Sequence, residues 1–308
     1  MDLLDRALVR LLPAVPKPIV RRISGRYIAG EELADALEVV RRHNAEGKLA
    51  TIDVLGEEIT NADEARAIAA AYRHAFEAIE LEGLDSNVSV KVTALGLKLG
   101  YELCRENLEA VVEHAAGRGN FVRIGMEDST TTDDTLQLYR GLRAAGLDNV
   151  GIVLQARLKR TVEDVRALAE LRPNVRLCKG IYLEPPQIAF RDFEAVRANF
   201  LQALGELWDT GCYVGVATHD DLLLDHASRG VARRGLGREE YEFQMLLGVL
   251  PTLGDSLVRD GHRLRIYTPF GRHWYGYSLR RLQENPRIAG YIAADTINRL
   301  VPGRNGSR

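Results

Sequence analysis

The sequence is poor in cysteine, and its three cysteines are scattered along the chain. Cys104, Cys178 and Cys212 show no paired spacing such as CxxC, so neither a disulfide framework nor a structural zinc site is expected, and a reducing compartment fits best. Cys178 lies inside an apolar run, which is typical of a small core residue rather than a nucleophile. We therefore expect a protein that holds no metal and uses no cysteine nucleophile.

Long hydrophobic runs and an excess of charge are also missing. No stretch reaches the roughly 18 apolar residues of a membrane span, and no signal peptide is evident. The 41 basic and 43 acidic residues leave a net charge of −2, which gives no indication of nucleic acid as a partner. We expect a cytoplasmic protein. The start, residues 3–12, predicts a short amphipathic helix. We favour packing on the body of the protein, and the alternative is peripheral contact with the inner face of the cell membrane.

What the sequence does have is a regular alternation of short and long segments from residue 50 onward. The short runs are rich in Val, Ile, Leu and aromatic residues and often end in glycine or a polar residue, which predicts β-strands. The longer segments between them carry apolar residues at helical spacing. Eight strands are expected, at residues 50–56, 87–95, 121–126, 150–156, 175–182, 213–219, 241–248 and 264–271.

Strands that alternate with helices favour βαβ units and a parallel sheet. Eight units over about 250 residues favour a closed (βα)8 barrel of the TIM type, and no GxGxxG follows the first strand, as an open dinucleotide-binding sheet would require. We predict helices at 62–81, 131–145, 161–171 and 193–209. We also predict an N-terminal helical arm over residues 1–48 with its clearest helix at 31–47, a barrel over 49–302 with a last helix at 286–300, and a tail at 303–308.

Polar residues at the carboxyl ends of the strands are the first candidates for a site, because active sites of such barrels lie there. Lys91 interrupts a strand of Val, Ser and Thr; if it points inward it needs an anionic partner, and an outward lysine is the alternative. His219 fits a hydrogen-bonded structural role as well as a catalytic one. The set is Glu57, Lys91, Glu127, Asp128, Gln155, Arg176, Lys179, Tyr182, Thr218, His219 and Tyr267.

An arginine pair stands in the segment after the eighth predicted strand. On a helix, Tyr277, Arg280, Arg281 and Glu284 fall within one arc about 100° wide. Two adjacent guanidinium groups repel each other unless an anion lies between them, and a planar carboxylate matches their bidentate geometry. The alternative is a solvated basic helix face, which the aromatic residues nearby disfavour. We therefore predict a carboxylate-binding site on this helix.

Seven short motifs, in order and each at a strand end or on the helix after the eighth strand, resemble those of the proline dehydrogenase family. Its members include one half of bacterial bifunctional proline-utilisation flavoproteins. Each motif is weak by itself, and the signal lies in their order over roughly residues 50–290. They are VKVTAL at 90–95, LQA at 154–156, VRLCKGIY at 175–182, ATH at 217–219, EFQMLLG at 242–248, RIY at 265–267 and YxxRRxxEN at 277–285.

The resemblance implies an enzyme with a distorted (βα)8 barrel that holds FAD non-covalently over the carboxyl ends of its strands. Such an enzyme transfers a hydride from C5 of L-proline to flavin N5 and forms Δ1-pyrroline-5-carboxylate, the first step of proline catabolism. Its electrons pass to a membrane quinone. The sequence shows no aldehyde dehydrogenase half, so we expect a separate pyrroline-5-carboxylate dehydrogenase to carry out the second step.

The resemblance also implies roles for individual residues. The substrate-binding residues would be Lys91, Arg280 and Arg281 at the carboxylate, with Tyr267, Tyr277, Leu246 and Leu177 around the ring. The cofactor-binding residues would be Gln155, Arg176, Lys179, Thr218, His219 and Glu284, with Arg176 near the flavin ring. The catalytic residues would be Lys91, Arg176, Tyr267 and Glu284. Glu57, in the first strand-to-helix loop, would pair with Arg280 as a gate when substrate is bound.

One position departs from the family pattern. The family has an acidic residue two positions before the Glu at the end of the third strand, and Gly125 occupies that position here. We therefore expect the acidic partner of Lys91 to be missing, or to be supplied by Glu127 or Asp128.

Three other functions remain open from the residues alone. One is another flavin-dependent barrel oxidoreductase, such as a folate reductase. A second is a Schiff-base lyase of the aldolase type using Lys91 or Lys179, because a desolvated lysine beside another cation is an activated nucleophile. The third is a carboxylate-binding scaffold without flavin. The arginine pair and the tyrosines favour proline dehydrogenase over these.

Overall fold

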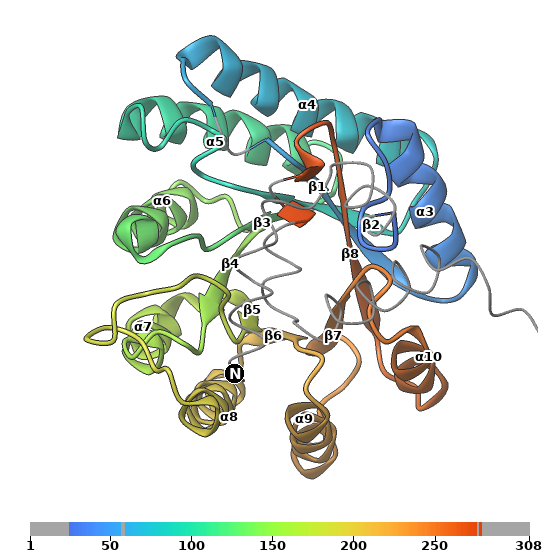
Figure 1. Cartoon of the computed structure of the whole chain (residues 1–308), viewed down its shortest axis with the longest axis vertical. Coiled ribbons are helices and arrows are strands. Elements are labelled where there is room, and N and C mark those ends of the chain that lie inside the picture. The colour runs from blue at the N-terminus through green and yellow to red at the C-terminus, as the bar shows by residue number, and fades with distance from the viewer. Residues whose placement is uncertain (1–24, 57–58, 276, 279–308) are drawn as a thin grey trace, which may run out of the picture.

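Eight parallel strands close into a barrel at the centre of the molecule. The computed structural model describes residues 25–56, 59–275 and 277–278. The strands follow one another in chain order, and β8 pairs with β1 to close the barrel (Figure 1). They are β1 (Leu49–Val54), β2 (Ser86–Val90), β3 (Val122–Ile124), β4 (Val150–Gln155), β5 (Asn174–Cys178), β6 (Tyr213–Ala217), β7 (Tyr241–Leu246) and β8 (Leu264–Phe270). The predicted (βα)8 barrel is confirmed.

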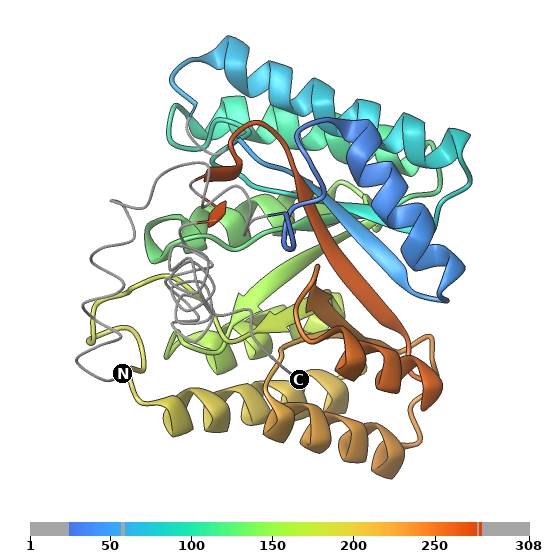
Figure 2. The same cartoon turned by 45° about the vertical axis from the view of Figure 1, so that its right-hand side comes forward.

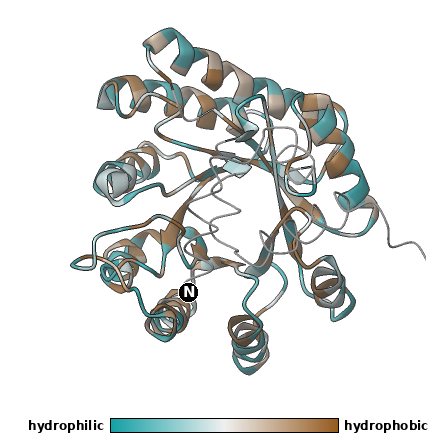
Figure 3. Cartoon of the chain, viewed as in Figure 1, coloured by the Kyte–Doolittle hydropathy of each residue, from teal (hydrophilic) through white to brown (hydrophobic). Residues whose placement is uncertain are grey.

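A layer of helices surrounds the barrel (Figure 1). Asn61, Asp192 and Asp220 cap three of them by accepting hydrogen bonds from backbone N–H groups in the first turn, which the helix itself leaves unpaired. Hydrophobic and hydrophilic residues both appear on every helix of the layer (Figure 3), as expected where one face is buried. The described helices are α3 (Leu33–Ala45), α4 (Ala62–Leu81), α5 (Tyr101–Ala116), α6 (Thr132–Ala144), α7 (Thr161–Leu168), α8 (Phe193–Asp209), α9 (Asp221–Arg234) and α10 (Pro251–Arg259).

The strands end earlier than the sequence predicts, and β2 and β5 differ most from the predicted bounds. After β2 the chain turns, and the N–H of Leu95 donates to the carbonyl of Lys91 at 3.2 Å. This local bond replaces pairing with a neighbouring strand, so the predicted strand over 87–95 stops at Val90. In the same way β5 stops at Cys178. Lys91 and Lys179 are therefore the first residues beyond their strands, at the carboxyl end of the barrel.

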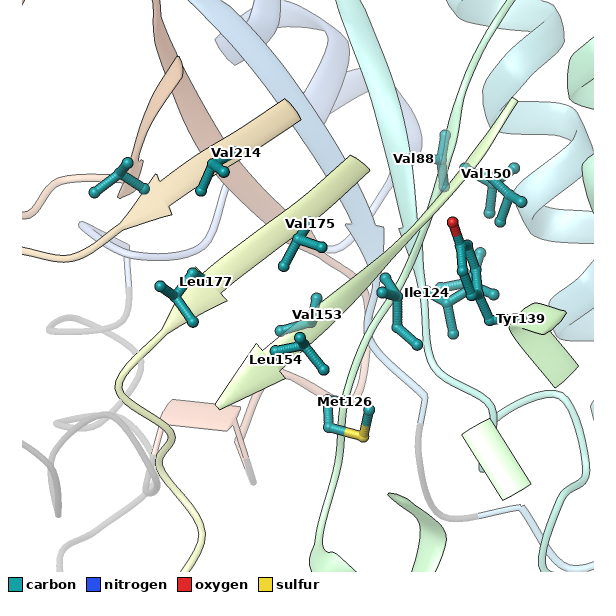
Figure 4. Packing of buried hydrophobic residues seen from close by; sticks show 14 of the residues in the cluster. Val88, Ile124, Met126, Tyr139, Val150, Val153, Leu154, Val175, Leu177 and Val214 are labelled. Atoms are coloured by element: carbon teal, nitrogen blue, oxygen red, sulfur yellow. The ribbon is translucent and has the colours of Figure 1, made fainter. Parts of the chain in front are cut away.

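The two faces of the strands differ in chemistry. Val88, Ile124 and Val150 belong to one hydrophobic core cluster with Tyr139 of α6 (Figure 4), and each fully buried aliphatic side chain contributes about 1.5–3 kcal/mol. Alternate residues point into the barrel, where polar and charged side chains bind one another across strands. A barrel interior is more often filled by Val, Ile and Leu, so this polar lining indicates a site. Those joined by hydrogen bonds are Asp53, Ser89, Arg176, Glu242, Gln244, Arg265 and Tyr267, with Lys91 just beyond β2.

The segment before α3 lies across the carboxyl ends of the last two strands. The N–H of Ala29 donates to the carbonyl of Pro269 at 2.9 Å. Gly248, with φ +71°, makes room for the crossing, because a Cβ there would lie 1.9 Å from the carbonyl oxygen of Arg26. Helix α3 then packs against β1 and β8 in the outer layer (Figure 2).

The remaining predictions about the chain ends are not tested. The helices expected at 3–12 and 286–300 and the tail at 303–308 lie outside the described residues, and the domain boundaries stay a prediction. Within the described part of the chain, no helix is both long and apolar enough to cross a membrane.

Candidate active site

A buried carboxylate joins three elements at the carboxyl end of the barrel. Asp53 of β1 is fully buried, and its Oδ2 lies 3.0 Å from Nζ of Lys91. The hydroxyl of Tyr267, on β8, donates to the same oxygen. Burial raises the pKa of Tyr267 well above its ordinary value, and the charge of Asp53 raises it further. At neutral pH this tyrosine is therefore a neutral hydrogen-bond donor.

Arg176 of β5 continues this set of side chains. Its guanidinium carbon lies 5.5 Å from the centre of the Tyr267 ring, within the range of a cation–π contact. Its Nε donates to Oε1 of Gln244 at 2.5 Å, and its Nη1 to Ser89 at 3.4 Å. Gly215 makes space for this amide, since a Cβ there would lie 2.4 Å from Nε2 of Gln244. Arg176 is thus held inside the barrel by partners on β2 and β7.

Deeper in the barrel, cations outnumber anions among the described residues. Gln244 and Arg265 both donate to Oε1 of Glu242, at 2.5 and 2.7 Å. Burial acts to raise the pKa of Glu242, but Arg265 in particular holds it below its ordinary value. Burial and the neighbouring Arg176 lower the pKa of Arg123 to about 9. Three guanidinium groups against one carboxylate make this interior favourable for an anionic ligand at its mouth.

Three of the residues expected near the cofactor lie at the ends of β4 and β6. Gln155 donates through Nε2 to the carbonyl of Met126 at 2.9 Å, which fixes its amide. Thr218 is buried and accepts from a backbone N–H two residues later at 3.1 Å. His219 accepts at Nε2 from the N–H of Leu246 at 3.0 Å, so that nitrogen is unprotonated in this arrangement.

A second carboxylate organises the rim beside β5 and β6. Asp220 accepts from Nζ of Lys179 at 2.5 Å and from Nη2 of Arg197 at 2.9 Å. Both cations also face the ring of Phe193, at 4.4 and 4.2 Å from its centre. Burial acts to raise the pKa of Asp220, but Arg197 and Lys179 lower it to about 2. Arg197 also donates to Glu194 at 2.8 Å, so both cations at this part of the rim are ion-paired.

The expected partner of Lys91 needs correction. It was expected to be missing or to be Glu127 or Asp128, and the structure gives Asp53 instead. Glu127 accepts from the N–H and the hydroxyl of Thr93, at 3.0 and 2.5 Å, and Asp128 accepts from a backbone N–H two residues later at 3.0 Å. The outward lysine is also wrong, since only 13% of the Lys91 side chain is exposed and it points into the barrel.

Two tyrosines expected around the substrate ring lie together. Tyr277 is buried with Ile28 and Leu55 in a small cluster against which Tyr267 packs. Ile28 comes from the segment that crosses the ends of β7 and β8. This segment therefore contributes an apolar side chain to the same corner of the site, which the sequence did not indicate.

The other expected ring contacts are placed differently. Leu246 is half-buried at the end of β7, on the face that carries Gln244. Leu177 neighbours Arg176 on β5, so strand alternation directs it to the opposite face, and it is fully buried in the main core cluster (Figure 4). Tyr182 is half-buried in the loop after β5. Glu57, Arg280, Arg281 and Glu284 lie outside the described residues.

Sequence reasoning missed the carboxylates that hold the site together. Asp53, Glu242 and Asp220 each bind a cation from another segment. Asp53 and Glu242 each stand at an alternate position in an apolar strand, and this pattern was the available signal. Among the described residues, no group of three or more His, Cys, Asp or Glu side chains is arranged to hold a metal ion.

The chain is similar in sequence to known proteins of one family. The family model described as Proline dehydrogenase matches residues 36–293. Proline dehydrogenase 1 of Bacillus subtilis subsp. natto is 36% identical over 267 residues, which cover 87% of this chain and 88% of that protein. Proline dehydrogenase of Deinococcus radiodurans is 35% identical over 274 residues, with 88% of each chain covered.

A solved structure shares the fold. The crystal structure of proline utilization A (PutA) from Bdellovibrio bacteriovorus, inactivated by N-propargylglycine, matches with a TM-score of 0.82 and 24% sequence identity. The match covers 90% of this chain but only 36% of that one, so the two share a barrel and not a whole protein. Because the family model spans most of the barrel and the two sequence relatives match over most of their length, this chain belongs to the proline dehydrogenase family.

Proposed function

We propose that this chain oxidises L-proline to Δ1-pyrroline-5-carboxylate with non-covalently bound FAD, and that a membrane quinone takes up the electrons. The observation that carries the proposal is the coincidence of the family match, over residues 36–293, with a connected set of inward side chains at the carboxyl end of the barrel. That set contains Lys91, Arg176 and Tyr267, which the family motifs had nominated independently.

The chemistry explains why no strong nucleophile is present in the set. Proline loses a hydride from C5 while the lone pair of its nitrogen stabilises the incipient iminium, so the amine reacts in its neutral form. The protein must orient C5, enclose the ring and provide positive charge nearby. Tyr267 and Tyr277 supply aromatic surface, and Lys91 supplies a donor for the carboxylate. Arg176 supplies a cation whose orientation is fixed by two partners.

The donor set at the rim fits FAD. When bound, FAD would supply the hydride acceptor at N5. Arg176 would lie near its ring, Gln155, Thr218 and His219 would line it, and Lys179 would offer positive charge to the diphosphate. The loop after β5 passes close to the end of β4 through Gly180, where φ is +90° and a Cβ would lie 3.1 Å from Cβ of Gln155. Backbone thus lies close to the groups that would line the cofactor.

The carboxylate clamp and the gate remain proposals from the sequence. Arg280 and Arg281 would bind the substrate carboxylate, Glu284 would contact both the substrate and the flavin region, and Glu57 would pair with Arg280 when substrate is bound. Glu57→Ala should then raise KM for proline, because the closed state loses its ion pair. An unchanged KM would remove the gate from the mechanism.

Anaerobic titration of the purified protein tests the main proposal. We expect a yellow protein whose flavin absorption bleaches on addition of L-proline. A colourless protein that FAD does not reconstitute would refute the proposal, and a yellow protein that proline leaves unbleached would favour another flavin substrate, as in a folate-reductase-like enzyme.

The geometry disfavours the Schiff-base alternative. Lys91 and Lys179 each donate to a buried carboxylate, at 3.0 and 2.5 Å. An ion-paired ammonium has no lone pair with which to attack a carbonyl. Neither lysine is therefore prepared as a nucleophile.

A further inference from the structure

One carboxylate oxygen holds together two of the residues proposed to contact the substrate. Oδ2 of Asp53 accepts from Lys91 at 3.0 Å and from the hydroxyl of Tyr267. These partners are 38 and 214 positions away in the sequence, so the pairing of β1 with β2 and with β8, and no local turn, creates the arrangement. Lys91, just after β2, and Tyr267, on β8, therefore donate to the same oxygen from opposite sides of β1.

This carboxylate is not arranged as a purely structural one would be. In the described part of the chain, its other oxygen, Oδ1, is buried without a hydrogen-bond partner, although buried polar atoms are normally paired. Asp164 on α7 offers a contrast. It is also buried, and both of its oxygens accept from Arg160, in three hydrogen bonds of 2.9–3.1 Å. Asp53 instead accepts from both of its donors at one oxygen, Oδ2.

The neighbouring strand β3 does not supply the acidic partner of Lys91. Gly125 follows β3 beside Lys91, and a Cβ there would lie 4.0 Å from Cγ of Lys91 and 3.1 Å from the carbonyl of Val90. Gly125 provides no charge, and the carboxylate of Glu127 is engaged by Thr93. Asp53 is the acidic partner of Lys91 that the structure describes.

We propose that Asp53 is a positioning residue, which holds the ammonium group of Lys91 and the ring of Tyr267 in one arrangement and acts on the substrate through them. The inference rests on the proposed function, because it takes Lys91 and Tyr267 as substrate contacts. Asp53 also balances the charge of Lys91, so the lysine can donate to a carboxylate without adding to the positive charge of the interior. Since Tyr267 lies against Arg176, the arrangement extends toward the residue proposed for the flavin ring.

Asp53→Asn tests the inference with little change in shape. The amide keeps the size of the carboxylate but loses its charge. We expect the flavin content per chain to stay at the wild-type level and kcat/KM for proline to fall by about 10- to 100-fold, as for a lost charge-assisted hydrogen bond. Asp164→Asn is the matched control for removal of another buried, ion-paired carboxylate, and its kcat/KM should stay within about twofold of wild type.

A double-mutant cycle separates positioning from general damage. Tyr267→Phe keeps the ring and removes the hydroxyl that donates to Asp53. If Asp53 acts through Tyr267, the double variant should lose little more activity than Asp53→Asn alone, whereas independent losses multiply. General damage would instead lower the flavin content together with activity.

Two results would overturn the inference: kcat/KM of Asp53→Asn within twofold of wild type, or losses that multiply in the double variant. If Asp53→Asn does not fold, the cycle can be run with Lys91→Gln and Tyr267→Phe while Asp53 is intact. Coupled losses there support the inference, and multiplying losses overturn it. Failure of proline to reduce the wild-type flavin would refute the proposed function, and this inference with it. Failure of the cycle alone leaves the proposed function standing.

Discussion

Asp53 and Asp220 are both buried at the carboxyl end of the barrel, and each accepts hydrogen bonds from two other side chains, yet they are built differently. Asp53 lies within β1, and among the described residues its side chain binds Lys91, just after β2, and Tyr267 of β8. Asp220 lies in the loop after β6, caps the first turn of α9 and holds two cations, Lys179 and Arg197. Local structure therefore supports Asp220, while Asp53 depends on the pairing of β1 with β2 and with β8 for the side-chain partners that the structure describes.

The largest effect on stability is expected for Asp53→Ala. The substitution leaves the ammonium group of Lys91, whose side chain is only 13% exposed, without this carboxylate. Breaking a buried ion pair in this way costs about 3–5 kcal/mol. Urea denaturation followed by circular dichroism gives the free energy of unfolding. A loss below about 1 kcal/mol would mean that Lys91 reaches water or another partner, and the contrast with Asp220 would not hold.

Asp220→Asn should lower the free energy of unfolding by less, about 1–2 kcal/mol at neutral pH. Asparagine still caps the helix, and Lys179 and Arg197, 26% and 22% exposed, can turn toward water, where ion pairs contribute little. Asp192→Asn on α8 is the matched control, because Asp192 caps its helix in the same way. Its effect should be close to zero, so a similar loss in both variants would assign the effect to capping rather than charge.

The smallest and most specific difference is expected in how the free energy of unfolding of wild type and Asp220→Asn changes at acid pH. Burial acts to raise the pKa of Asp220, but its two cations lower it from 3.8 to about 2. Because the folded-state pKa is depressed, the stabilisation is present above the unfolded-state pKa near 3.8 and is lost as the pH falls toward about 2. Asp220→Asn should therefore show a shallower loss of stability than wild type between about pH 4 and pH 2. Equal slopes would contradict the ion pairing.

The barrel could be predicted from the sequence because its signals are local. Helices at Ala62–Leu81 and Phe193–Asp209 have the bounds that their apolar spacing indicates, and each predicted strand is present. Strand ends were less accurate. Apolar residues follow Val90 as well as precede it, and composition does not distinguish a continued strand from the tight turn that begins at Lys91.

The sequence predicted the cationic and aromatic residues of the candidate site but not the carboxylate that binds them. Lys91, Arg176 and Tyr267 were nominated by their place at strand ends, and they do lie together. Asp53 carried a usable signal, since it alternates with buried apolar residues along β1. Which strands face it depends on the pairing of β1 with β2 and β8. No sequence window contains that register, so Glu127 was considered in its place.

The hydrogen bond between Tyr267 and Asp53 also bears on how the protein assembles. It joins residues 214 positions apart, and Arg265 donates to the carbonyl of Ala50, 215 positions away, across the same seam between β8 and β1. Contacts so distant in sequence tend to form late, because a long loop must close first. We expect an intermediate with the seam between β8 and β1 still open to lack the contact of Tyr267 with Asp53, although pairing of β1 with β2 already brings Lys91 to Asp53. A ligand bound at the rim would then select the completed barrel and stabilise it by mass action.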